Sequence, residues 1–294
     1  MPEVTLAAVQ MRCAADPSVN LDTAERLVRA AARDGAQVIL LPELFERPYF
    51  CQERRYDYYA YATPVEENPA VQRLAPLARE LGVVLPVSIY ERDGNRLFNS
   101  VAMIDADGRL LGVYRKTHIP DDHYYQEKFY FTPGDLDFVP IDTSVGRLGV
   151  LVCWDQWYPE AARLMALRGA EMLIYPTAIG LESADTPEEQ ERQREAWTTV
   201  QRGHAVANGI PVVTVNRVGY EPDPSGLTGG IRFWGSSFVA GPQGELLYRA
   251  SADREESVIV DVDMKRSEQV RRWWPFLRDR RIECFGPLTR RFID

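Results

Sequence analysis

One cysteine lies where a folded chain of this kind could present a nucleophile. Cys153 directly follows the apolar run Leu148–Val152, which predicts a buried strand, and a helix is expected to begin near Pro159. Strand ends that face helix N-termini are where α/β proteins bind ligands and hold nucleophiles. The N–H groups of that helix would favour a thiolate and could hold a developing oxyanion. The alternative is that Cys153 packs as a small hydrophobic residue, because free cysteine is often buried.

A nucleophilic thiol needs a base, and the sequence offers two kinds. Histidine is scarce: His118 follows a predicted strand, His204 lies inside a predicted long helix, and His123 is the third. A Cys–His pair stays open, although no local motif supports it. Glu43 ends a second buried strand, within the apolar segment Leu41–Phe45. Partial desolvation there would make Glu43 a usable base, whereas a solvated carboxylate at a loop edge is the alternative.

Lys116 is the third candidate for chemistry. The chain has 34 basic residues, of which only three are lysines, so a lysine directly after the strand expected to end at Tyr114 stands out. Its ammonium could lower the pKa of a nearby thiol and balance the charge of an oxyanion, whereas the alternative is an ordinary surface lysine. We expect the strand ends that carry Glu43, Lys116 and Cys153 to converge at one edge of the fold.

The elements that must position these residues alternate along the chain. Helices are expected at 21–33, 69–81, 159–168 and 187–208, the first, second and fourth followed by a glycine. Strands are expected at 4–8, 37–41, 83–90, 98–104, 110–114, 148–152, 172–175, 212–215, 236–240, 246–248 and 258–262. This alternation predicts an α/β layered fold with mixed sheets, and because no linker interrupts it we expect a single domain over 1–294.

Composition limits the partners that can be expected. A chain of 294 residues with 45% hydrophobic residues can bury a large core, and its net charge of −9 disfavours nucleic acid. The four cysteines lack C-x-x-C spacing, no apolar run reaches membrane-spanning length, and the first residues lack a basic leader. We therefore expect a cytoplasmic protein with no membrane partner. Three histidines could scarcely build a metal site, so neither a metal nor another cofactor is expected.

Three segments are recognisable together. Leu41–Phe45, Tyr114–Pro120 and Val152–Glu160 resemble, in this order, the three signature blocks of the nitrilase (carbon-nitrogen hydrolase) superfamily. The resemblance covers nearly the whole chain and implies that family's four-layer α-β-β-α sandwich.

The resemblance also implies a role for each matching residue. Glu43 would be the general base, Lys116 the oxyanion stabiliser and Cys153 the nucleophile, and the backbone N–H of Trp154 would complete the oxyanion hole. Glu127 matches a second glutamate that the family often carries, and it would position Lys116 and the substrate nitrogen.

Other segments narrow the resemblance to one branch. The stretches 119–135, 175–180 and 274–282 look like the branch that hydrolyses the ureido group of N-carbamoylputrescine. This implies release of putrescine, carbon dioxide and ammonia through a Cys-linked carbamoyl intermediate, in polyamine biosynthesis from agmatine. Glu182 matches an acidic residue that holds the distal ammonium of this cationic substrate, although solvation beside other acids is an alternative. Tyr49 and Trp154 could line the aliphatic chain and contact the ammonium by cation–π interaction.

Two other kinds of function stay open. A β-ureidopropionase or an N-carbamoyl-D-amino acid amidase would keep the chemistry but hold a carboxylate, for which an arginine is needed in place of the acid. A non-catalytic binding protein on the same fold is the alternative from a different class. The tail, residues 264–294, interleaves arginines with aromatic residues, which could suggest RNA. The resemblance and the acidic remainder favour packing across a subunit interface, so we expect a homo-oligomer, at least a dimer.

Overall fold

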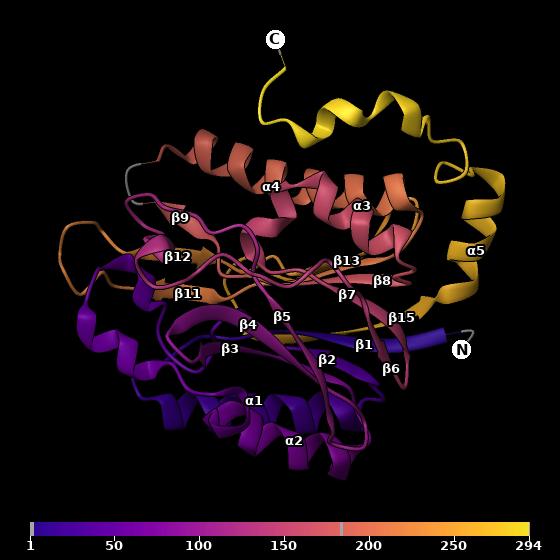
Figure 1. Ribbon diagram of the computed structural model, residues 1–294. Coiled ribbons are helices and arrows are strands. Elements are labelled where there is room, and N and C mark those ends of the chain that lie inside the picture. Colours follow the sequence, from indigo (N-terminus) through magenta and orange to yellow (C-terminus); the bar gives the residue numbers. More distant parts are fainter. Residues whose placement is uncertain (1–2, 183–184, 294) are drawn as a thin grey trace.

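Four layers of secondary structure build the molecule. The computed structural model describes residues 3–182 and 185–293. Figure 1 shows two β-sheets face to face, with α1 and α2 covering one outer side and α3 and α4 covering the other. These helices are α1 (Pro17–Arg33), α2 (Pro69–Leu81), α3 (Pro159–Leu167) and α4 (Pro187–Asn208). The expected α-β-β-α sandwich is therefore confirmed.

The first sheet combines two three-stranded groups, β15-β1-β2 and β3-β4-β5. A parallel bridge between Val38 and Val84 joins them. Only β1 and β2 are paired in parallel within these groups, so the sheet is mixed. Its strands are β1 (Glu3–Gln10), β2 (Val38–Leu40), β3 (Leu85–Asp93), β4 (Arg96–Ile104), β5 (Leu110–Arg115) and β15 (Glu256–Asp263).

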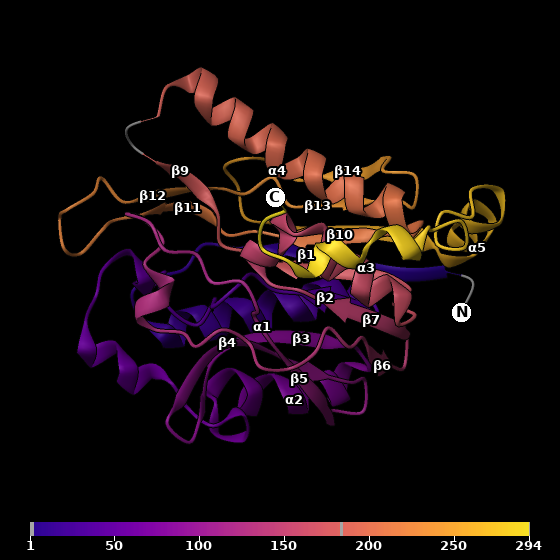
Figure 2. The same ribbon diagram turned by 45° about the horizontal axis from the view of Figure 1, so that its top comes forward.

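The second sheet has the order β14-β13-β10-β8-β7-β6 and is also mixed, with β7, β8 and β10 parallel. Its strands are β6 (Ile141–Thr143), β7 (Gly146–Val150), β8 (Met172–Pro176), β10 (Val212–Val215), β13 (Phe238–Ala240) and β14 (Leu246–Arg249). A small antiparallel sheet, β11-β12-β9, lies at one end of the sandwich (Figure 2). It contains β9 (Gly180–Glu182), β11 (Val218–Glu221) and β12 (Ile231–Trp234).

Alternation along β1 explains why the sheets stack. Val4, Leu6 and Ala8 join the core between the two sheets, whereas Ala7 and Val9 join the core beneath α1 and α2. Successive strand side chains point to opposite faces, so a strand with apolar residues on both faces must be covered twice. One sheet face thus packs on the other sheet and the opposite face packs on helices.

Capping signals set the helix ends. α2 ends at Gly82 with φ +68° and α4 ends at Gly209 with φ +62°, as their sequences predict. α1 begins at Pro17, four residues before the expected start, because the side chain of Asp16 accepts the N–H of Ser18 and proline is favoured in the first turn.

Several short elements were not predicted from the sequence. They are β6, β9, β11, β12, helix α5 (Met264–Trp273) and the 3₁₀ turns Phe50–Gln52, Tyr56–Tyr61, Val65–Glu67, Glu127–Phe129, Cys153–Trp157, Ile282–Cys284 and Gly286–Thr289. α5 is tied to the end of α4, since Arg271 Nε donates to the carbonyl of Asn208 at 3.2 Å. The chain beyond α5 passes over the outer helical layer, drawn yellow in Figure 1. Within 3–182 and 185–293, no helix is both long and apolar enough to cross a bilayer.

Candidate active site

Two of the predicted site residues lie at strained turns. Cys153 has φ +43° and Leu44, directly after Glu43, has φ +50°. Residues other than glycine rarely adopt this left-handed conformation, which costs about 1–3 kcal/mol and is concentrated at functional sites. The turn at Cys153 opens a 3₁₀ turn shortly after β7, and the turn at Glu43 follows β2. Both sharp turns direct a side chain away from the path of its strand.

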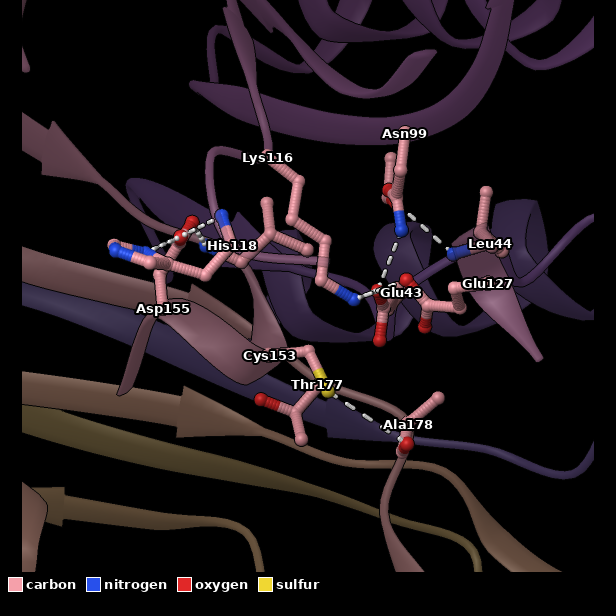
Figure 3. Close-up of polar contacts among 12 residues, drawn as sticks. Glu43, Leu44, Asn99, Lys116, His118, Glu127, Cys153, Asp155, Thr177 and Ala178 are labelled. Atoms are coloured by element: carbon pink, nitrogen blue, oxygen red, sulfur yellow. Dashed lines mark hydrogen bonds and ion pairs between the residues drawn. The ribbon is translucent and has the colours of Figure 1, made fainter. Parts of the chain in front are cut away.

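Lys116 lies between two carboxylates. Its Nζ is 2.8 Å from Glu43 Oε1 and 2.6 Å from Glu127 Oε2, and all three side chains are fully buried. Figure 3 shows these side chains converging from separate segments of the chain. Burial by itself lowers the pKa of Lys116, but the negative charges of Glu127 and Glu43 outweigh it and hold that pKa well above its ordinary value. Lys116 is therefore a fixed positive charge.

Glu43 keeps one oxygen for chemistry. Its Oε1 accepts hydrogen bonds from Lys116 Nζ and from Asn99 Nδ2 at 2.6 Å. Its Oε2 is buried and has no hydrogen-bond partner among the described residues. A carboxylate with one oxygen fixed and the other unused can accept a proton without losing its position.

Cys153 lies close enough to Glu43, Lys116 and Glu127 for their charges to affect its thiol. Its Sγ contacts the carbonyl of Ala178 at 3.8 Å, and the side chain is buried. Burial raises the pKa of the thiol well above its ordinary value; the charge of Glu43 raises it further, and Lys116 opposes both. Burial thus opposes the thiolate that the adjacent helix N–H groups were expected to favour. A base that takes the thiol proton, the role expected of Glu43, is therefore needed for reaction.

Glu127 is the carboxylate poised near neutrality. Burial raises its pKa to about 7, the charge of Glu43 adds to this, and Lys116 opposes it. Its Oε1 accepts the hydroxyl hydrogen of Tyr49 at 2.6 Å, while its Oε2 accepts from Lys116. Tyr49, which we expected to line the substrate's chain, therefore supports Glu127.

The histidines take partners other than the thiol. Nδ1 of His118 lies 2.7 Å from Asp155 Oδ1, and its ring stacks on Tyr158 with centroids 3.6 Å apart. Nε2 of His204 lies 2.8 Å from the carbonyl of Gln156. This geometry does not support a Cys–His pair.

Asp155 was not singled out from the sequence, yet it links two parts of the site. It is fully buried and accepts the backbone N–H of His118 at 2.9 Å and of Val152 at 3.0 Å. Tyr114 also donates its hydroxyl hydrogen to Asp155 at 2.7 Å. The segment that carries Lys116 is thus held against the turn that carries Cys153.

Glu182 and Trp154 are the remaining predicted site residues. Glu182 is half-buried at the end of β9, where burial and the charges of Asp122 and Asp185 raise its pKa. Trp154 is half-buried and meets Trp157 edge to face, with centroids 6.3 Å apart.

Tyr125, which the sequence did not indicate, lies between Tyr49 and the start of β9. Its ring meets Tyr49 edge to face at 5.6 Å, and its hydroxyl accepts the N–H of Gly180 at 2.9 Å. Burial raises its pKa well above the ordinary value, and the hydrogen bond from the N–H of Gly180 opposes this. Tyr125 therefore connects the ring of Tyr49 to the start of β9, the strand that carries Glu182.

The described ranges contain no group of three or more His, Cys, Asp or Glu side chains arranged to hold a metal ion. A buried thiol beside a carboxylate with an unused oxygen and a fixed ammonium can perform acyl transfer by covalent catalysis.

Comparison with known families settles the class. Residues 5–272 match the model of a family described as carbon-nitrogen hydrolase. This chain belongs to the carbon-nitrogen hydrolase family. The carbon-nitrogen hydrolase described here is 50% identical over 287 residues to the N-carbamoylputrescine amidase of Solanum tuberosum, covering 97% of this chain and 94% of the relative. It is 41% identical to the citrullinase of Francisella tularensis, covering 99% and 100%.

A solved structure supports the same grouping. The crystal structure of a carbon-nitrogen hydrolase from Helicobacter pylori G27 matches with a TM-score of 0.96 and 46% identity, over 99% of this chain and 100% of that chain. The resemblance inferred from the three sequence segments is thus confirmed at the level of family and fold.

Proposed function

We propose that this carbon-nitrogen hydrolase cleaves the ureido group of N-carbamoylputrescine, giving putrescine, carbon dioxide and ammonia, as a step of polyamine biosynthesis. One observation carries the proposal. The Glu43–Lys116–Glu127 cluster lies beside Cys153 in a chain half identical to an enzyme named N-carbamoylputrescine amidase.

The first half-reaction forms a thiocarbamate. Oε2 of Glu43 takes the thiol proton as Sγ of Cys153 forms a bond to the ureido carbon. Lys116 Nζ and the backbone N–H of Trp154 stabilise the oxyanion. Glu43 then passes the proton to the terminal nitrogen, the C–N bond breaks, and ammonia leaves. Glu127 orients Lys116 and that nitrogen throughout.

The second half-reaction regenerates the thiol. Glu43 removes a proton from water, whose oxygen attacks the thiocarbamate carbon, and the C–S bond breaks as Cys153 regains a proton. The product is an N-carboxy amine, which decomposes to putrescine and carbon dioxide. The enzymatic reaction consumes one water molecule.

The outer residues select the cation. Glu182 provides a carboxylate for the distal ammonium of the substrate, and its raised pKa reflects burial beside other acids, which a cation would relieve. The rings of Tyr49 and Trp154 line the aliphatic chain.

Ammonia release from a panel of ureido compounds tests this function. N-carbamoylputrescine, citrulline, N-carbamoyl-β-alanine and an N-carbamoyl-D-amino acid are supplied at equal concentration to the purified protein. We expect the highest kcat/KM with the diamine derivative. A preference for citrulline or an N-carbamoyl amino acid would refute the cation site, and release from none would favour a non-catalytic binding protein.

Assembly and location complete the proposal. The chain acts as one domain, residues 1–294, whose segment 264–294 packs across a subunit interface in a homo-oligomer. Exposed apolar side chains on that segment support this, among them Trp274 at 47% and Phe292 at 82% exposure. A monomer mass independent of concentration in light scattering would contradict it.

All four cysteines are free thiols, which supports a location in the cytoplasm.

A further inference from the structure

A fully buried guanidinium lies behind the turn that carries Glu43. Arg217, in the turn between β10 and β11, is 0% exposed. Its Nε donates to the carbonyl of Glu43 at 3.1 Å, and its Nη1 donates to the carbonyl of Arg47 at 3.0 Å. Its Nη2 donates to the carbonyl of Leu44. One side chain therefore binds three main-chain carbonyls of a single segment.

This segment needs such support. Leu44 has φ +50°, so the chain turns sharply after Glu43, and residues 43–47 lie outside any helix or strand. Of the three carbonyls, that of Leu44 also accepts the N–H of Arg47, at 3.4 Å. A buried carbonyl without a donor costs about 1–3 kcal/mol. The guanidinium presents five N–H groups in a rigid fork, which suits several acceptors at once.

The counter-ion of Arg217 extends the network to the second carboxylate. Glu221 Oε1 accepts from Arg217 Nη1 at 2.8 Å, and its Oε2 accepts the backbone N–H of Tyr49 at 2.5 Å. The hydroxyl of Tyr49 in turn donates to Glu127. Both carboxylates that bind Lys116 are thus connected to the same buried ion pair, Glu43 through its backbone and Glu127 through Tyr49.

We propose that Arg217 is a positioning residue for the reaction and acts together with Glu221. The ion pair fixes the backbone turn at Glu43 and the position of Tyr49, so that the carboxylates of Glu43 and Glu127 stay hydrogen-bonded to Lys116. The inference rests on the proposed hydrolytic role of that cluster. The four hydrogen bonds of Arg217 described above all go to protein groups, so it acts through Glu43 and Tyr49 and contacts no reacting atom.

Arg217→Lys tests the role. Lysine keeps a positive charge opposite Glu221, but its single nitrogen cannot span three carbonyls. Because a misplacement of about 1 Å can cost about 10²-fold in rate, we expect kcat to fall at least about tenfold while KM changes less than about threefold. Alkylation of Cys153 by iodoacetamide, followed by peptide mass spectrometry, should slow in parallel, because proton transfer to Glu43 is impaired.

The matched control is Arg202→Lys. Arg202 is partly buried and, like Arg217, donates its Nε to a main-chain carbonyl, that of Gly244 at 2.6 Å, but it lies on the outer helix α4. This variant should keep wild-type kcat and alkylation rate. A folded Arg217→Lys variant, with a cooperative thermal transition, that matched wild type in either readout would overturn the proposal.

Glu221→Gln decides the matter if Arg217→Lys does not fold. Glutamine keeps the shape but faces either Arg217 or the N–H of Tyr49 with a donor, so kcat and alkylation should again fall together; wild-type values would overturn the proposal. Alkylation needs no substrate. If wild type hydrolysed no ureido compound, the proposed function would fail, while a slower reaction of Cys153 in the variants would still support the positioning role.

Discussion

The hydroxyl of Tyr49 donates a hydrogen bond to Oε1 of Glu127 at 2.6 Å, inside a fully buried region. The carboxylate receives Lys116 on its other oxygen, so Tyr49 fixes the orientation in which Glu127 holds the ammonium. Tyr49, which was expected to contact the substrate, therefore also helps to hold the charged groups of the reactive cluster in place.

Tyr49→Phe should lower kcat by about 10- to 100-fold, because a hydrogen bond to a charged group contributes about 1.5–3 kcal/mol. The matched control is Tyr58→Phe, which removes the same bond, hydroxyl to Glu53 Oε1 at 2.6 Å, outside the cluster. Steady-state kinetics of both variants make the comparison. Equal losses in the two variants would show that the hydroxyl of Tyr49 has no special role.

The pH dependence of activity should follow the ionisation of Glu127. Burial raises the pKa of this carboxyl to about 7. The ionised carboxylate accepts from both Tyr49 and Lys116, and a proton on it would oppose one of these donors. Activity should therefore fall as pH decreases through about 7 and level off above it. The hydrogen bond from Tyr49 lowers this pKa, so in Tyr49→Phe the fall in activity at low pH should move to higher pH. Rates measured from pH 5.5 to 8.5 that show no limb, or one of opposite sign, would contradict this assignment.

Glu182→Gln should raise KM for N-carbamoylputrescine about tenfold and leave kcat nearly unchanged, because it removes a charge that contacts only the distal ammonium. N-butylurea, which has the same chain without the ammonium, is the internal control, and its KM should not change. A similar rise for both compounds would place Glu182 outside the cation site.

Asp155→Asn should destabilise the fold by about 1–3 kcal/mol, since the amide nitrogen would face a buried donor such as the N–H of Val152. Urea denaturation measures the free energy of unfolding. Asp261→Asn serves as the control: it is exposed and accepts only from Thr5 in the described hydrogen bonds, so its change should stay within about 0.5 kcal/mol. Equal stability of the two variants would show that Asp155 is not a structural link.

Local pattern was sufficient to predict most elements and to single out Glu43, Lys116 and Cys153 as candidates, whereas their roles came from the family resemblance. Buried strands announce themselves by apolar runs, and Glu43, Lys116 and Cys153 each follow one closely, so their convergence could be inferred from the layered fold. The strands of the small sheet were missed because they are short and partly polar; β9 is defined by pairing with β12, far along the chain.

The supporting residues depend on contacts that local pattern does not contain. Arg217 is one arginine among many, and only folding places it under the turn at Glu43. The pKa of Cys153 depends on packing in the same way: the adjacent helix is visible in the sequence, whereas burial and the nearby charge of Glu43 arise from the fold.

The central claim is that Cys153 carries the substrate's carbamoyl group during turnover. Rapid acid quench of wild type mixed with N-carbamoylputrescine, followed by peptide mass spectrometry, tests it directly. We predict a thiocarbamate that retains the aminobutyl chain on the peptide containing Cys153, and neither adduct nor ammonia release in Cys153→Ala. Ammonia release by Cys153→Ala, or an adduct on another residue of wild type, would contradict the account.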